Sequence, residues 1–170
     1  MTSFSLPLFS RLSPKIARAS REMAQMQGYY ESHALAVAEG DWGALSAVSS
    51  GIHNVYNGIE DILLGLARDI DDSVPTGASA HQDVLDQMAA EVVGMRPALL
   101  DASLHEALVE LKGFRHLVRH KYGFDLRPDK VIENFKLLQS AFPAFIEAVR
   151  ELERAMKDAD DDGALNGAGS

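Results

Sequence analysis

The chain has 170 residues, of which 46% are hydrophobic and 7% aromatic, and it contains no cysteine. This composition is ordinary for one globular domain, and the lack of cysteine excludes disulfide bonds and thiolate metal sites. Sixteen Lys and Arg against 25 Asp and Glu give a formal net charge of −9, which disfavours indiscriminate binding to polyanions. No apolar run reaches the roughly 20 residues of a membrane span, and the first residues make a poor secretory signal. We therefore expect a soluble, cytoplasmic protein.

The N-terminal part is predicted to form an arm followed by a helix. Residues 1–12 are of mixed composition and contain proline, which favours an extended arm. Ser13 and Pro14 are a good helix start, with serine as the cap and proline in the first turn. An apolar stripe then continues to about Glu39, and Gly40 is expected to end the helix.

A long second helix is predicted from Trp42 to about Ile70, with Asp41 as its N-terminal cap. We expect Gly51 and Gly58 either to bend it or to allow close contact with another helix. Its apolar positions recur at helical spacing: Leu45, Val48, Ile52, Val55, Ile59, Ile62, Leu63 and Leu66.

Three further helices complete the prediction. A short one covers about His81–Val92, and the next is capped by Asp101 and runs from Ala102 to Tyr122. The last begins at Arg127-Pro128.

Pro143 is expected to kink the last helix or to divide it. The acidic, Gly- and Ala-rich residues 158–170 are expected to be a disordered tail. No strand pattern is present, so the sequence predicts an all-α domain over residues 13–157. Its architecture would be an up-and-down bundle of four to five helices.

A cationic segment stands out within this acidic protein. Between Lys112 and Lys130 six basic residues face two acids, a net charge of +4, which leaves −13 for the rest of the chain. Such an island predicts an anionic ligand, and phosphate is the first choice. The alternative is a solvated helix end, in which the cations only complement the helix dipole.

The spacing within this segment sets a geometric condition. Arg115 and Arg119 lie four residues apart, as do His116 and His120, so each pair shares a helix face. Arg115 and His120, five residues apart, are separated by about 140° on an ideal helix. They could meet at one phosphate only if the helix tightens or unwinds near its end, or if a second chain supplies a partner.

The same residues carry a resemblance to a known family. Arg115-x4-His120-x-Tyr122 resembles the Arg-x4-His-x-Tyr signature of HepT-like toxins, which belong to the HEPN superfamily of helical ribonucleases. Residues 52–71 resemble the second helix of that family, and residues 110–123 resemble its active-site helix. The resemblance covers about residues 15–156.

The resemblance implies a metal-independent endoribonuclease, the toxin of a toxin–antitoxin pair. Histidine titrates near neutral pH and arginine presents a permanently charged fork to phosphate oxygens. We therefore expect His120 to be the general acid/base and Arg115 to clamp the phosphate while the neighbouring 2′-hydroxyl attacks. The product would carry a 2′,3′-cyclic phosphate.

Other residues are expected to support this chemistry. The flanking RNA phosphates would be held by four residues: Lys112, His116, Arg119 and Lys121. Asn54, Asn57 or Glu60 would orient His120 or the substrate, although each could equally belong to a polar outer face or to a satisfied buried network.

The resemblance also implies regulation and assembly. A cognate minimal nucleotidyltransferase antitoxin would adenylylate Tyr122 and silence the toxin, whereas an ordinary Tyr122 would only pack in the core. A homodimer with a shared cleft is implied as well.

Three alternatives remain open from the sequence. One is a non-catalytic HEPN-type binding subunit of a nucleotidyltransferase, and another is a helical scaffold whose basic stripe only aids solubility. The third concerns His116 and His120, which could bind zinc as an H-x3-H pair. We expect no metal and no cofactor, because a third ligand is lacking nearby and four cations would repel the ion.

Overall fold

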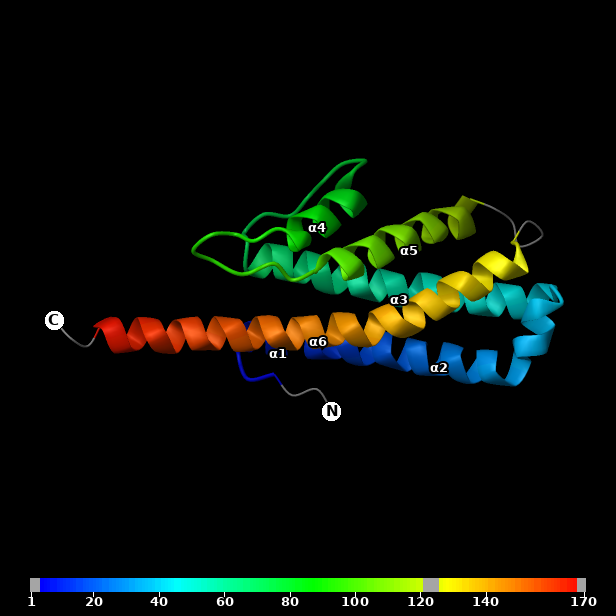
Figure 1. The fold of residues 1–170 in the computed structure, drawn as a ribbon, viewed down its shortest axis with the longest axis horizontal. Helices are drawn as coiled ribbons and strands as arrows, with labels where there is room; N and C mark the ends of the chain where they lie inside the picture. The colour runs from blue at the N-terminus through cyan, green and yellow to red at the C-terminus, as the bar shows by residue number, and fades with distance from the viewer. Residues whose placement is uncertain (1–3, 121–125, 168–170) are drawn as a thin grey trace.

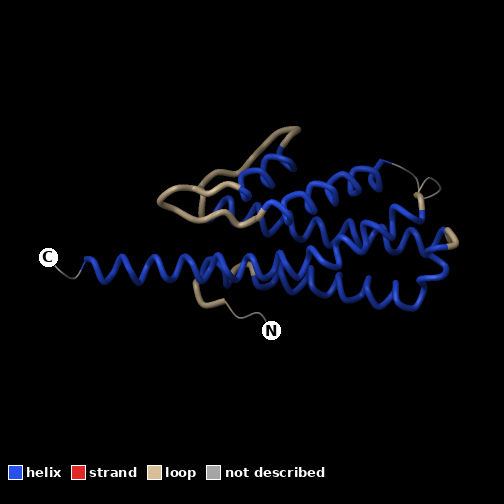
Figure 2. The backbone as a smooth tube through the Cα atoms, viewed as in Figure 1, coloured by secondary structure: helices blue, strands red, loops and turns tan. Residues whose placement is uncertain are grey.

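The computed structural model describes residues 4–120 and 126–167, with side chains described for residues 4–118 and 126–163. Within these ranges the chain is all-α, as predicted, and strand pairing is limited to one isolated bridge between Val92 and Arg96 (Figure 2). The helices are α1 (Pro7–Ser10), α2 (Ser13–Ala38), α3 (Trp42–Asp69), α4 (Ala80–Ala89), α5 (Ala102–His120) and α6 (Pro128–Gly167).

Helix α3 is the centre of the bundle. It contacts α2, α4, α5 and α6, while the long helices α2, α3, α5 and α6 lie side by side and α4 covers one end of α3 and α5 (Figure 1). The predicted apolar stripe of α3 is fully or almost fully buried, from Leu45 to Leu66. Each such side chain contributes about 1.5–3 kcal/mol of transfer free energy, so α3 is the best-anchored element of the fold.

Two glycines let α2 approach α3 closely. A Cβ on Gly51 would lie 2.7 Å from the side chain of Met26, and a Cβ on Gly58 would lie 2.9 Å from Cβ of Ala19. Close helix contact, one of the two roles predicted for these glycines, is therefore confirmed.

Two predicted helix starts are confirmed by their caps. The Asp41 carboxylate accepts a hydrogen bond of 2.8 Å from the amide of Ala44, and Asp101 accepts one of 2.8 Å from the amide of Leu104. Each bond satisfies an amide that has no partner within the helix, so the aspartates fix where α3 and α5 begin.

Helix α4 is shorter than predicted. It ends at Ala89 rather than near Val92, because the chain turns back in the segment 92–96, where Gly94 adopts φ +79° and Val92 pairs with Arg96. The side chain of Arg96 then inserts under the helix, where it binds Asp71 at the end of α3. This buried ion pair holds α4 and the following turn against the bundle.

The N-terminal arm is more structured than predicted. An extended arm was predicted, but within the described residues 4–12 the chain forms α1, and Phe4, Phe9 and Leu12 are buried in the core. Oε1 of Glu153 on α6 accepts hydrogen bonds of 2.7 Å from the amides of residues 5 and 6. Apolar side chains and a long-range cap therefore order the arm.

Helix α6 excludes one of the two effects expected of Pro143 and is longer than predicted. Pro143 is exposed and does not divide the helix, so the hydrogen bond that proline cannot make is lost on the solvent side. The helix also continues through residues 158–167, where a disordered tail was predicted. Its C-terminal part projects beyond the other helices (Figure 1).

In the described part of the chain, no helix is both long enough and apolar enough to cross a membrane.

Candidate functional site

The described basic side chains of α5 share one face of that helix. Lys112 and His116 are one turn apart, and Arg115 lies beside them. His116 is exposed, whereas the side chain of Arg115 is only 15% exposed and is held against α3. An almost buried guanidinium beside exposed cations is unusual for a helix face that serves only solubility.

Two residues of α3 surround the Arg115 guanidinium. Tyr56 and Glu60 are one turn apart and therefore project from the same face of α3. The Arg115 Nη1 atom lies 3.9 Å from Oε2 of Glu60, and Cζ lies 6.0 Å from the centroid of the Tyr56 ring. Arg115 is thus positioned by a carboxylate and an aromatic face from α3, the central helix of the bundle.

His81, in the first turn of α4, completes the cluster. Its Nδ1 lies 2.6 Å from Oε1 of Glu60 and 3.4 Å from Nη1 of Arg115. Because the carboxylate can only accept, the short contact places the proton on Nδ1, and the longer approach of Arg115 is then electrostatic rather than a hydrogen bond. We name these four residues, Tyr56, Glu60, His81 and Arg115, the Arg115 cluster.

Several buried polar atoms of the Arg115 cluster have no hydrogen-bond partner among the described residues. They are the Tyr56 hydroxyl, Oε2 of Glu60 and Nε of Arg115. Burial raises the pKa of Tyr56 well above its usual value, and the nearby Glu60 charge raises it further, so this tyrosine stays protonated. Buried polar atoms left without partners are rare in structural networks and frequent at functional sites.

Two cavities open on either side of Arg115. One, of about 400 Å³, is bordered by α4 and α5, and its lining includes His81, Gln82, Lys112, Arg115 and His116. The other, of about 470 Å³, is lined by Ser50, His53 and Asn54 of α3 together with Arg115 and Val118 of α5. Arg115 therefore borders two solvent-accessible cavities, from either of which an external anion could approach it.

The three predicted supporting residues of α3 have different surroundings. Glu60 lies in the Arg115 cluster, as described above. Asn54 borders the second cavity, and its amide donates a 3.4 Å hydrogen bond to Glu22. Asn57 is partly buried, and its Oδ1 has no partner among the described residues. Of the three, Glu60 is the one that contacts Arg115.

The predicted phosphate-binding and catalytic residues are described in part. Lys112 donates a hydrogen bond to the side-chain oxygen of Gln82 and lines the same cavity as His116. The backbone of α5 is helical through His120, but the side chains of Arg119 and His120 lie outside the described residues, as do Lys121 and Tyr122. The described helix therefore does not unwind between Arg115 and His120, and the angular separation between these positions persists.

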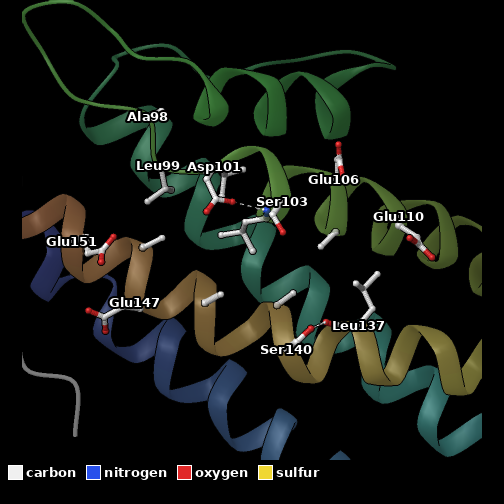
Figure 3. A pocket seen from close by; sticks show the side chains of 16 residues that line it. Ala98, Leu99, Asp101, Ser103, Glu106, Glu110, Leu137, Ser140, Glu147 and Glu151 are labelled. Carbon is white, nitrogen blue, oxygen red and sulfur yellow. Dashed lines mark hydrogen bonds between the residues drawn. The ribbon is translucent and has the colours of Figure 1, made fainter.

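A third and larger cavity has the opposite charge. It measures about 800 Å³, lies between α5 and α6, and has a floor of alanine and leucine side chains (Figure 3). Its acidic residues are Asp101, Glu106, Glu110, Glu147 and Glu151. A phosphate backbone would be repelled there, so the two sides of α5 differ in the ligand that they can accept.

The described residues contain no group of three or more His, Asp or Glu side chains that could hold a metal ion. The Arg115 cluster joins a carboxylate, a histidine and a tyrosine around a largely buried guanidinium. Its chemistry is that of proton transfer and anion binding.

Tyr56 and His81 are the members of the Arg115 cluster that sequence analysis did not predict as site residues, and His81 is the more distant in sequence from the predicted ones. His81 lies 34 residues before Arg115 in a short helix, and no spacing pattern connects the two residues. The sequence shows only that His81 lies in the first turn of the helix that follows α3. Its proximity to Glu60 depends on how the two helices pack, which the sequence does not show.

Comparison with known proteins gives one match. Residues 47–156 match the model of a family described as HepT-like protein. No curated protein and no solved structure matches the chain. The matched range begins within α3, ends within α6 and includes every residue of the Arg115 cluster.

Proposed function

The chain belongs to the HepT-like family of HEPN proteins, and from that premise we propose that it is a metal-independent endoribonuclease, the toxin of a toxin–antitoxin pair. Proteins of this family usually have ribonuclease activity. The observation that carries the proposal is the Arg115 guanidinium, held almost buried by Glu60 and Tyr56 at the border of two cavities. A fixed arginine fork at an open cavity is suited to a phosphodiester.

The reaction follows from these groups. The 2′-hydroxyl of a ribose attacks the adjacent phosphorus, the bond to the 5′ oxygen breaks, and a 2′,3′-cyclic phosphate and a 5′-hydroxyl result. Arg115 stabilises the negative charge that develops on the phosphorus oxygens, and His120 exchanges a proton with a reacting oxygen. Lys112, His116, Arg119 and Lys121 bind the neighbouring phosphates of the strand.

The test is cleavage of RNA by the purified protein in the presence of a chelator. We expect wild type to produce 2′,3′-cyclic phosphate ends and to leave a strand with 2′-deoxyribose at the cleavage position intact. His120→Ala is expected to lose at least about 10²-fold in rate, the usual contribution of a general acid or base. Cleavage by His120→Ala at the wild-type rate would refute the assigned role.

Regulation through Tyr122 is part of the proposal. Adenylylation would place a tethered phosphate and nucleotide next to the cationic face of α5 and compete with RNA for it. Incubation with a minimal nucleotidyltransferase encoded beside the toxin, together with ATP, should add AMP units to wild type but none to Tyr122→Phe, as read from intact mass. An unmodified wild type would refute this control.

A homodimer is proposed on geometric grounds. Arg115 and His120 lie about 140° apart on a helix that remains regular between them, so a second copy is one way to bring both groups to one phosphate. Mixing inactive Arg115→Ala and His120→Ala proteins tests this, because exchange of subunits would restore part of the activity. No recovery despite demonstrated exchange would mean that each copy acts alone.

A further inference from the structure

We propose that His81 is the general base of the cleavage reaction, the group that removes the proton from the attacking 2′-hydroxyl. The inference rests on the proposed ribonuclease function. It starts from a mismatch between signature and structure: the described histidine beside the Arg115 guanidinium is His81, 3.4 Å away, whereas His120 lies on a different side of α5.

Glu60 prepares His81 for this role. Its carboxylate accepts the Nδ1–H of His81 at 2.6 Å, which fixes the tautomer with the lone pair on Nε2. A carboxylate on the far ring nitrogen also stabilises the imidazolium that forms when Nε2 takes up a proton. The same logic operates in hydrolases that pair histidine with a buried acid.

The exposure of the pair fits catalysis better than packing. The Glu60 side chain is 8% exposed, whereas that of His81 is 46% exposed and lines the cavity of about 400 Å³. The acid is therefore shielded from water while the histidine is open to a ligand. In an RNA strand bound in that cavity, the 2′-hydroxyl is next to the phosphate whose oxygens Arg115 would bind. His81 and Arg115 would therefore act on the same cleavage step.

The charges around His81 come from two neighbouring helices. Glu60 faces it from α3, and Arg115 approaches it from α5, where Lys112 and His116 line the same cavity. On α4 itself the carboxylate of Asp83 is bound to the Ser79 hydroxyl at 2.6 Å. The cations of α5 attract the substrate phosphate to the cavity that His81 lines.

The proton balance needs no further reactant. His81 Nε2 takes the 2′-hydroxyl proton as the bond from O2′ to phosphorus forms, and His120 gives a proton to the 5′ oxygen as its bond to phosphorus breaks. His81 leaves the step protonated and His120 deprotonated, and exchange with water restores both. Two histidines thus divide a task that the signature assigns to one.

The chain supplies a matched control for His81. His105 on α5 also binds a carboxylate, Asp86 on α4, with Nε2 2.8 Å from Oδ1. This pair joins α4 to α5, whereas the His81–Glu60 pair joins α4 to α3, and it lies outside the cavity that His81 lines. Replacing His105 removes a comparable histidine–carboxylate contact between α4 and α5 without touching the Arg115 cluster.

The first experiment measures single-turnover cleavage of RNA at saturating protein between pH 5 and 8.5. We expect His81→Gln to be slowed about 10²–10⁴-fold and to lose the acidic limb of the bell-shaped rate profile, with RNA affinity within about threefold of wild type. His105→Gln should keep the rate and the profile of wild type. Wild-type kinetics for His81→Gln, or an equal loss in His105→Gln, would overturn the proposal.

A modified substrate separates base from acid. When sulfur replaces the 5′ bridging oxygen, the leaving group departs as a thiolate and needs no proton. The substrate should therefore restore most of the rate to His120→Ala and little to His81→Gln. Restoration of His81→Gln instead would mean that it acts as the acid, and would refute its role as base.

The outcomes also separate this inference from the proposed function. If wild type cleaves RNA and His120→Ala does not, the ribonuclease proposal stands, and the behaviour of His81→Gln alone decides the role of His81. If wild type leaves RNA intact with both substrates, the two proposals fall together.

Discussion

The buried pair of Asp71 and Arg96 gives the sharpest stability prediction. The side chain of Arg96 is fully buried and that of Asp71 is 5% exposed. All five N–H donors of the guanidinium are used: two bind the Asp71 carboxylate at 2.6 and 2.7 Å, and three bind backbone carbonyl oxygens of residues 87, 90 and 97 at 2.9–3.0 Å. In Asp71→Asn the charge is lost and an amide N–H₂ faces the guanidinium donors.

The expected loss of stability follows from the interactions that Arg96 keeps in Asp71→Asn. The positive charge of Arg96 stays buried, tied to its three carbonyls and without a counterion. Removing one partner of such a pair destabilises by about 3–5 kcal/mol. For a chain of this length each kcal/mol lowers Tm by about 2–4 °C, so Asp71→Asn should melt roughly 6–20 °C below wild type.

The pair of Asp71 and Arg96 also makes this loss of stability dependent on pH. Burial tends to raise the pKa of Asp71, but the hydrogen bonds from Arg96 and Gln87 and the charge of Arg96 outweigh it and hold the pKa below 3.8. A depressed folded-state pKa contributes stability that is complete above about pH 4 and is lost as pH falls through the lowered value. The difference between wild type and Asp71→Asn should therefore persist from pH 7 to about pH 4.5 and shrink below about pH 3.8.

Urea unfolding followed by circular dichroism measures both effects. A matched control is Glu133→Gln, which breaks an ion pair with Lys130 whose two side chains are more than half exposed, and it should cost less than about 1 kcal/mol. If Asp71→Asn costs no more than this control at pH 7, or if its cost is the same at pH 3 as at pH 7, the argument from the buried pair is wrong.

Three further predictions follow from packing and from the site. Gly58→Ala should be less stable than Gly28→Ala by about 1–3 kcal/mol in thermal unfolding, because its new methyl group meets a carbon of α2 at 2.9 Å whereas that of Gly28 meets nothing within 4 Å. Glu153→Gln should lose about 1.5–3 kcal/mol and speed proteolysis of the N-terminal arm, since it weakens two charge-assisted bonds to the arm's amides; an unchanged cleavage rate would contradict that cap. Arg115→Lys should keep RNA affinity within about tenfold but lose about 10²–10³-fold in cleavage rate, and full activity with lysine would show that charge alone suffices.

Most of the fold could be predicted from local signals. The stripe of α3 and the caps Asp41 and Asp101 set helix positions that the structure confirms, because spacing and capping act within a few residues. The errors lie where distant contacts decide. The N-terminal arm is ordered by the burial of Phe9 and by hydrogen bonds to Glu153, near the other end of the chain. The segment after α4 is fixed by the ion pair between Arg96 and Asp71, 25 residues earlier.

The candidate site divides in the same way. The signature pointed to Arg115, and the polar positions of α3 included Glu60, so these residues could be anticipated from sequence. His81 could not, because its relation to both residues exists only once α4 packs across α3 and α5. The sequence also could not choose among Asn54, Asn57 and Glu60, because all three lie within two turns of the same helix. In the structure Glu60 lies 3.9 Å from Arg115.

The residues that line the cavity beside Arg115 lie on helices that are anchored differently in the fold. Glu60 and Arg115 lie on long helices of the bundle, whereas Ser79, His81 and Gln82 belong to a ten-residue helix or its cap. This helix is held by its buried apolar side chains and by the Arg96–Asp71 pair. Glu60 and Arg115 are thus fixed by the core of the bundle, whereas His81, the proposed general base, is carried by the short helix α4. Grafting the segment between α3 and α5 from another member of the family, with its own aspartate–arginine pair and with histidine kept at position 81, should change substrate preference while leaving the Arg115 guanidinium in place.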